Sequence, residues 1–123
     1  MKLISSRDNP FFKELLKLSS SAKFRRERSL TLLDGAHLLA AYLDSANVPQ
    51  HVLLNAAALQ DEEIIRLLGK LENVAVTQLD DKLFAELSEL KTPTGILALI
   101  PTRDALMSAA HFALLLEDIQ DPG

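Results

Sequence analysis

Four short runs of apolar residues, separated by segments with helical spacing, are the feature that most constrains the fold of this chain. The runs are Leu30–Leu33, Val52–Leu54, Val74–Thr77 and Ile96–Ile100. Because candidate strands alternate with candidate helices, the pattern predicts an α/β layered sandwich with a small mixed sheet of about four strands. The runs are apolar throughout, which indicates that helices cover both faces of the sheet.

Two helices are expected before the first strand. The first begins at Asn9 and Pro10, since Asn caps a helix well and Pro at the first helical position loses no needed hydrogen bond. Its apolar stripe consists of Phe11, Leu15 and Leu18. Ser20 or Ser21 is expected to cap a second helix over Ala22–Glu27. We expect both helices to pack on the edge of the sheet through that stripe.

Charge is distributed unevenly along the chain, whose formal net charge is −4. Residues 1–30 hold eight basic and three acidic side chains, a net charge of +5, whereas the rest of the chain sums to −9. The basic side chains are Lys2, Arg7, Lys13, Lys17, Lys23, Arg25, Arg26 and Arg28. This split predicts a basic N-terminal face that meets a polyanion, mounted on an acidic body that does not.

The composition excludes several classes of site. The 123 residues include no cysteine, which removes disulfides, thiolate nucleophiles and cysteine-ligated zinc. His37, His51 and His111 are too far apart in sequence for ligand spacing, so we expect no metal site. No apolar run is long enough to span a bilayer, and the N-terminus is too polar beyond Ile4 for a signal peptide. We therefore expect a soluble, cytoplasmic protein without membrane partners.

The last twenty residues do not follow the alternating pattern. Thr102–His111 is interpreted as a linker, Phe112–Leu116 as a buried strand, and Glu117–Gly123 as a polar loop at the carboxyl end of that strand. In α/β proteins such loops build ligand sites. We therefore predict one domain over residues 1–101, a linker over 102–111, and the start of a second domain over 112–123.

Several motifs resemble the N-terminal part of the SpoU or TrmH group of SPOUT-superfamily RNA methyltransferases. The most specific is Leu114–Gly123, which is similar to the first motif of the catalytic domain of that group. Ile4-Ser5-Ser6 with Asn9-Pro10 and Lys13 resembles the opening of the group, and Lys23–Arg28 with Leu32–Gly35 resembles its basic segment and first strand. Thr92–Ile96 resembles the loop that enters the last strand of its substrate domain. Asp34 departs from the group, which usually has Glu at that position.

The resemblance implies a domain that recognises RNA within a larger enzyme. The N-terminal domain of the group resembles ribosomal proteins that bind kinked RNA. Its C-terminal domain binds S-adenosylmethionine, dimerises, and transfers a methyl group to a ribose 2′-hydroxyl of rRNA or tRNA. By this resemblance the cofactor site, the catalytic residues and the homodimer contact all lie beyond Gly123. The 123 residues are then expected to bind no cofactor and to catalyse nothing alone.

The expected RNA-binding residues come from the basic segment. They are Lys13, Lys17, Lys23, Arg25, Arg26 and Arg28. Few acidic partners stand near the cluster, and phosphates attract such clusters through counterion release. The alternative is a solvated charged face without a ligand. Phe24, inside the cluster, is interpreted either as a platform for a base or as a core contact.

Other features have two interpretations each. Asp34-Gly35 is either a site carboxylate or, as we prefer, a helix cap with a flexible turn. Thr92, Thr94 and Gly95 form either an RNA-contacting loop or a plain loop. Glu117, Asp118 and Asp121 resemble a metal-ligating loop but are interpreted as the start of a broken motif.

Two other functional classes are compatible with alternating strands and helices. One is a free-standing protein that binds kinked RNA and has no catalytic domain. The orphan strand Phe112–Leu116 argues against this class. The other is a signalling receiver domain, which needs clustered acids at strand ends. The third strand ends in Thr77-Gln78 and the last in Pro101, so this class is disfavoured.

Overall fold

The computed structural model describes residues 1–88 and 94–103. Its strands are β1 (Lys2–Ile4), β2 (Leu30–Asp34), β3 (His51–Leu54), β4 (Ala75–Leu79) and β5 (Ile96–Pro101). Its helices are α1 (Pro10–Ser20), α2 (Ala22–Arg28), α3 (Ala36–Asp44), α4 (Glu62–Leu68) and α5 (Asp81–Leu87), with a 3₁₀ helix η1 over Ala56–Gln60. The expected alternation of strands and helices is therefore confirmed in these ranges.

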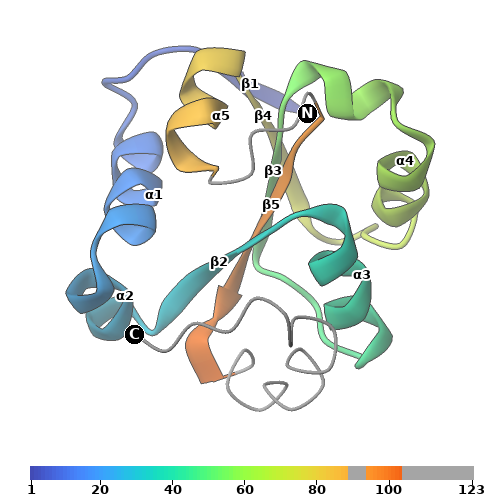
Figure 1. The fold of residues 1–123 in the computed structure, drawn as a ribbon, viewed down its shortest axis with the longest axis horizontal. Helices are drawn as coiled ribbons and strands as arrows, with labels where there is room; N and C mark the ends of the chain where they lie inside the picture. Colours follow the sequence, from blue (N-terminus) through green and yellow to red (C-terminus); the bar gives the residue numbers. More distant parts are fainter. Residues whose placement is uncertain (89–93, 104–123) are drawn as a thin grey trace, which may run out of the picture.

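The strands form one mixed sheet in the order β1-β4-β3-β5-β2 (Figure 1). β1, β4 and β3 run parallel to one another, and β5 runs antiparallel to both of its neighbours, β3 and β2. A receiver domain has a doubly wound parallel sheet in a different order. The antiparallel interior strand β5 therefore excludes that class.

Helices cover both faces of the sheet, as the apolar strands predicted. Along β5, Ile96, Ala98 and Ile100 join the core beneath α3, η1 and α4, whereas Leu97 and Leu99 join the core beneath α1, α2 and α5 (Figure 1). This alternation follows from the two-residue period of a strand. The fold is thus a three-layer α/β/α sandwich with two separate cores.

Capping side chains set the starts of the N-terminal helices. The Asn9 side chain accepts a hydrogen bond from the Phe12 backbone N–H at 3.1 Å, and Ser21 accepts one from the Phe24 N–H at 3.1 Å. These bonds satisfy backbone N–H groups that have no partner inside the helix. The predicted start at Asn9 is therefore confirmed, and of the two predicted caps Ser20 and Ser21, Ser21 is the one observed.

The structure differs from the sequence-based expectation in three places. β1 and η1 were not predicted. Phe12, not Phe11, completes the buried stripe of α1 with Leu15 and Leu18. The N-terminal helices lie over one face of the sheet beside the edge strand β2, and α1 also contacts α5 (Figure 1). The predicted packing on the edge of the sheet is therefore confirmed, and the stripe of α1 also reaches the core that lies beneath α5.

Within the described ranges, no helix has the length and apolar character needed to cross a membrane. The predicted linker extends past Arg103, and the predicted strand Phe112–Leu116 and acidic loop fall on residues 104–123. These predictions lie outside the described residues, apart from Thr102 and Arg103.

Candidate nucleic-acid interface

Two helices, α1 and α2, carry all six of the predicted RNA-binding side chains. Lys13 and Lys17 lie one turn apart on α1, and both are exposed. Lys23 and Arg26 lie three residues apart on α2 and are exposed too. The α1–α2 pair, residues 10–28, holds six basic and two acidic side chains, a net charge of +4. The pair thus presents a concentrated positive charge at the surface.

Phe24 is the centre of a small cluster at the junction of α1 and α2. The Arg28 guanidinium carbon lies 4.8 Å from the centroid of the Phe24 ring, and the Lys17 Nζ lies 5.6 Å from it. Arg28 also pairs with Glu14, with Nη1 and Oε1 2.9 Å apart. The ring itself packs against the core beneath α1. Phe24 is therefore a half-buried core contact with two cations close to its ring.

Arg25 differs from the other cations of the α1–α2 pair. It is half-buried, and its Nη1 donates a hydrogen bond to the Leu18 carbonyl at 2.6 Å. Leu18 lies in the last turn of α1, where carbonyl groups lack helical partners and a positive charge is favourable. Arg25 therefore holds the end of α1 against α2, and it faces inward.

The structure thus divides the six predicted residues into three groups. Lys17 and Arg28 lie beside the Phe24 ring, and Arg25 is half-buried with its guanidinium turned towards Leu18. Lys13, Lys23 and Arg26 extend into solvent, and the described part of the chain offers none of them an ion-pair partner. These last three side chains are best placed to meet phosphates.

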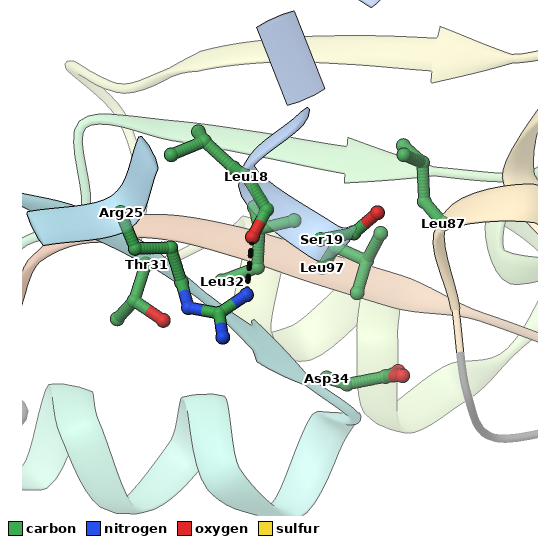
Figure 2. A pocket seen from close by; sticks show the side chains of 8 residues that line it. All are labelled: Leu18, Ser19, Arg25, Thr31, Leu32, Asp34, Leu87 and Leu97. Atoms are coloured by element: carbon green, nitrogen blue, oxygen red, sulfur yellow. Dashed lines mark hydrogen bonds between the residues drawn. The ribbon is translucent and has the colours of Figure 1, made fainter. Parts of the chain in front are cut away.

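A cavity of about 310 Å³ lies between α1, α2 and the strands below them. Its apolar lining comes from Leu18, Leu32, Leu87 and Leu97, and its polar lining from Ser19, Arg25, Thr31 and Asp34. Figure 2 shows that Arg25 enters from α2, whereas Asp34 stands at the end of β2. The cavity is therefore lined by four leucines and four polar side chains, among which are one cation and one anion.

Asp34 is held by a residue that the sequence did not single out. The Ser88 hydroxyl, just after α5, donates to the Asp34 carboxylate, with Oδ2 at 2.9 Å and Oδ1 at 3.1 Å. The cap position of α3 is taken by Gly35, without a side-chain hydrogen bond. The preferred interpretation of Asp34 as a helix cap was therefore wrong. Gly35 has a φ of 114°, a conformation that favours glycine, so the predicted turn is confirmed.

Gly95 has a structural role that explains its position before β5. A Cβ atom placed on Gly95 would lie 2.2 Å from the Phe84 ring. The Gly95 N–H donates to the Asn55 side-chain oxygen at 3.1 Å, and the same oxygen accepts from the Ala58 N–H at 3.0 Å. Buried Asn55 thus ties the end of β3 to the start of β5. Of the loop interpreted either as RNA-contacting or as a plain loop, Thr92 lies outside the described residues.

Histidines and acids do not converge on a metal position in the parts of the chain that the structure describes. His37 is almost fully exposed, with its Nδ1 3.7 Å from a Glu63 oxygen. His51 lies on β3, with its ring centroid 4.8 Å from that of Phe11 and its Nε2 2.7 Å from the Thr77 hydroxyl oxygen. Burial lowers the pKa of His51 below its ordinary value. His111 lies outside the described residues.

Comparison with known proteins gives relatives of one kind. The 23S rRNA (guanosine(2553)-2′-O)-methyltransferase RlmP of Bacillus subtilis is 29% identical over 124 residues, which cover all of this chain and 47% of that protein. The crystal structure of an RNA 2′-O ribose methyltransferase is similar with a TM-score of 0.70 and 24% identity, over 81% of this chain and 37% of the other. An AdoMet-bound rRNA methyltransferase from Sinorhizobium meliloti follows, with a TM-score of 0.62 and 19% identity, over 83% and 37%.

These relatives are longer than this chain, which spans about half the length of the curated one. The structural likeness, at these identities, establishes that the three-layer fold is shared. The match to a family is more direct, because the profile of the MRM3-like substrate binding domain covers residues 9–98. That range contains the whole α1–α2 pair and every residue that lines the cavity. The chain belongs to the MRM3-like substrate binding domain family.

Proposed function

We propose that this chain is the RNA-recognition domain of an S-adenosylmethionine-dependent methyltransferase that modifies a ribose 2′-hydroxyl of rRNA or tRNA. Within it, the α1–α2 pair contacts the phosphates of the substrate. The observation that carries this proposal is the set of three exposed cations, Lys13, Lys23 and Arg26, on a domain of a substrate-binding family. Because the relatives named above are methyltransferases more than twice the length of this chain, we favour an enzyme domain over a free-standing RNA-binding protein.

The physical basis is counterion release. A phosphate neutralised by Lys or Arg releases condensed counterions, and this favours binding independently of sequence. Lys13, Lys23 and Arg26 are free to make such contacts, whereas Lys17 and Arg28 are partly engaged with Phe24 and Glu14. The acidic remainder of the chain repels the RNA backbone. The domain therefore has one favoured orientation on its substrate.

The architecture of the parent enzyme forms part of the same proposal. Residues 1–101 bind the RNA substrate, 102–111 form a linker, and 112–123 begin the methyltransferase domain. S-adenosylmethionine then binds to that second domain, as its binding to a longer structural relative supports. The parent is proposed to be a cytoplasmic homodimer joined through that second domain.

The test measures the salt dependence of RNA binding by this chain. If about four phosphates are neutralised, the slope of log affinity against log salt is about −3 to −4. The triple variant Lys13→Gln/Lys23→Gln/Arg26→Gln should weaken binding and flatten the slope by about 2 to 3. Fluorescence anisotropy with a labelled fragment of rRNA, at several salt concentrations, gives both values.

A matched control separates a local site from an effect of net charge. The variant Arg66→Gln/Lys70→Gln/Lys82→Gln removes the same number of exposed positive charges from α4, the turn after it, and α5. We expect it to keep the slope of the wild-type chain. Equal weakening by both triple variants would show that net charge, rather than the α1–α2 pair, governs binding.

A further inference from the structure

Arg28, the last residue of α2, is held in place from two sides. Its guanidinium carbon lies 4.8 Å from the centroid of the Phe24 ring, and its Nη1 lies 2.9 Å from Oε1 of Glu14. Phe24 in turn packs against the core beneath α1, and Glu14 belongs to α1 itself. The position of this guanidinium is therefore set by both helices of the α1–α2 pair.

Stability alone does not account for this arrangement. The side chains of Arg28 and Glu14 are 50% and 46% exposed. Ion pairs as exposed as this one stabilise a fold very little, because water and salt screen them and both side chains lose rotamer freedom. An exposed cation that is already ordered is suited to binding, since it loses little further freedom when a ligand arrives.

The ion pair with Glu14 leaves one edge of the Arg28 guanidinium open. A guanidinium presents five N–H donors in a planar fork. Glu14 contacts Nη1, so the side edge formed by Nε and Nη2 remains, and the described residues provide no hydrogen-bond acceptor for it. Two parallel N–H groups on one edge match two oxygens of a phosphate group. This edge is therefore suited to a bidentate contact with one phosphate.

A second cation at the same ring offsets the charge of Glu14. The Lys17 Nζ lies 5.6 Å from the centroid of the Phe24 ring. Lys17 and Glu14 are three residues apart on α1, a spacing that places them on the same helix face. The cluster of Glu14, Lys17 and Arg28 holds one acid and two bases, a net charge of +1. A phosphate therefore meets a positive site despite the carboxylate within it.

We infer that Arg28 binds one phosphate of the RNA through its Nε and Nη2 edge, and that Glu14 and Phe24 are positioning residues for this contact. The inference rests on the proposed function, because the three exposed cations of the α1–α2 pair bring the RNA to this face. Those cations attract phosphates wherever their side chains reach. Arg28, which is held in one place, fixes the position of a single phosphate and hence the register of the strand.

Glu14 has two opposing effects on binding, and their sizes decide the sign. Its carboxylate repels the phosphate, but at an exposed site water and salt reduce this repulsion to roughly 2-fold in affinity or less. Ordering one long side chain during binding lowers affinity by roughly 2- to 10-fold. Because Arg28 is ordered before the RNA arrives, positioning outweighs repulsion over most of this range. Removal of this acid should therefore weaken the binding of a polyanion.

The first experiment compares the two acids of the α1–α2 pair. Glu14→Ala removes the ion pair with Arg28. Glu27→Ala removes an equal charge from an exposed position on α2 that has no ion pair in the described part of the chain. At physiological salt, Glu14→Ala should bind the labelled rRNA fragment roughly 3-fold more weakly than the wild-type chain. Glu27→Ala should bind it equally well or up to about 2-fold more tightly. Unchanged or tighter binding by Glu14→Ala would overturn the inference, because repulsion alone predicts that result.

The second experiment separates positioning from a loss of helix stability. Arg28→Lys keeps the charge but lacks the fork, so it should lower affinity roughly 5-fold and leave the salt slope unchanged. Arg66→Lys, on exposed α4, is the matched control and should leave affinity unchanged. In the Arg28→Lys background, Glu14→Ala should weaken binding no further, because no fork is left to position. A further loss as large as that in the wild-type background would show that Glu14 acts through α1 and would overturn the inference.

The contact itself has a direct signal, and the two proposals fail in different ways. In ¹H–¹⁵N spectra, the Arg28 Nε–H signal should shift when the rRNA fragment is added, and an unchanged signal would overturn the bidentate contact. Binding that keeps the expected salt slope but is indifferent to Arg28→Lys would overturn the phosphate site and leave the proposed function standing. A wild-type chain that does not bind the fragment would overturn both.

Discussion

The two helical layers on either side of the sheet contribute differently to the molecule. The α1–α2 pair carries a net charge of +4, and the layer formed by α3 and α4 belongs to residues 36–71, whose net charge is −2. Both layers nevertheless rest on fully buried side chains, Phe12 beneath α1 and Tyr42 on α3. The cavity lies on the α1–α2 side. Stability is thus shared between the layers, whereas the features that suit an anionic ligand are concentrated in one.

This difference shows how a charged surface and a buried core occupy the same helices. The sheet has one apolar row of side chains for each face, as the alternation along β5 illustrates. The outer surface of each layer is then free to carry whatever charges its function requires. Phe24 and Arg25 connect the charged outer surface to the buried core, because each stands among the basic residues and also contacts the interior.

The largest expected effect tests whether the two helical layers contribute equally to the free energy of unfolding. In this test, one buried aromatic ring is truncated in each layer. Phe12→Ala and Tyr42→Ala should each lower the free energy of unfolding by about 3–5 kcal/mol, because each leaves a large cavity in a fully buried position. Urea denaturation measures both. A cost for Phe12→Ala of less than half that for Tyr42→Ala would show that α1 is a loosely attached addition rather than an equal layer.

A smaller effect distinguishes the inward-facing arginine from its exposed neighbour. Arg25→Lys should cost about 1 kcal/mol, since the fork of Arg25 that bonds the Leu18 carbonyl is lost. Arg26→Lys, on the exposed side of α2, should change stability by less than about 0.5 kcal/mol. Comparison of their urea midpoints decides this. Equal midpoints would mean that the Arg25 contact contributes nothing to the α1–α2 junction.

A still smaller effect is the dependence of stability on pH, which should differ between variants of two histidines. Because burial lowers the pKa of His51 below its unfolded value near 6.5, the unfolded chain binds the proton more readily. The stability that neutral His51 provides is present above pH 6.5 and is lost as the pH falls through its lower folded pKa. Urea denaturation at pH 7.5 and 5.5 should show this loss, and His51→Asn should reduce it. His37→Asn, which alters an exposed side chain, should leave the loss unchanged.

The last prediction is that this chain shows no binding of S-adenosylmethionine. If RNA and cofactor bind to separate domains, as proposed, this chain should give no saturable heat with S-adenosylmethionine in isothermal calorimetry at micromolar to millimolar ligand. The cofactor site is proposed to belong to the second domain, which follows this one. Saturable binding would show that the cofactor binds to the substrate-binding domain itself. It would also mean that the charge difference between the two layers does not describe all of the binding by this domain.

Regular elements with strong local signals were predictable from the sequence. The continuous apolar runs predicted β2, β3 and β5 to within one or two residues. β4 extends two residues further than expected. β1 was missed because it has three residues, two of them exposed, and exists only through pairing with β4, more than 70 positions away. No local periodicity encodes such a partner.

The candidate site was predictable in composition but not in orientation. Charge counting found all six cations, yet it did not separate Arg25, which turns inward, from Arg26 beside it. That separation depends on the carbonyl of Leu18, seven residues before Arg25, and on the angle between two helices. Asp34 and Ser88 are 54 positions apart, so neither their contact nor the cavity that Asp34 lines had a signal in the sequence.

The order of pairing in the sheet has a consequence for synthesis on the ribosome. Among the strands of the described residues, β2 pairs only with β5 and β1 pairs only with β4. Both strands that flank the N-terminal helices therefore pair only after segments that are synthesised much later. At about 5–20 residues per second, the wait for β5 lasts several seconds. During that interval the basic N-terminal segment has emerged but has no sheet to cover. The surface proposed to bind RNA is therefore among the first parts to be synthesised and the last to be fixed in place.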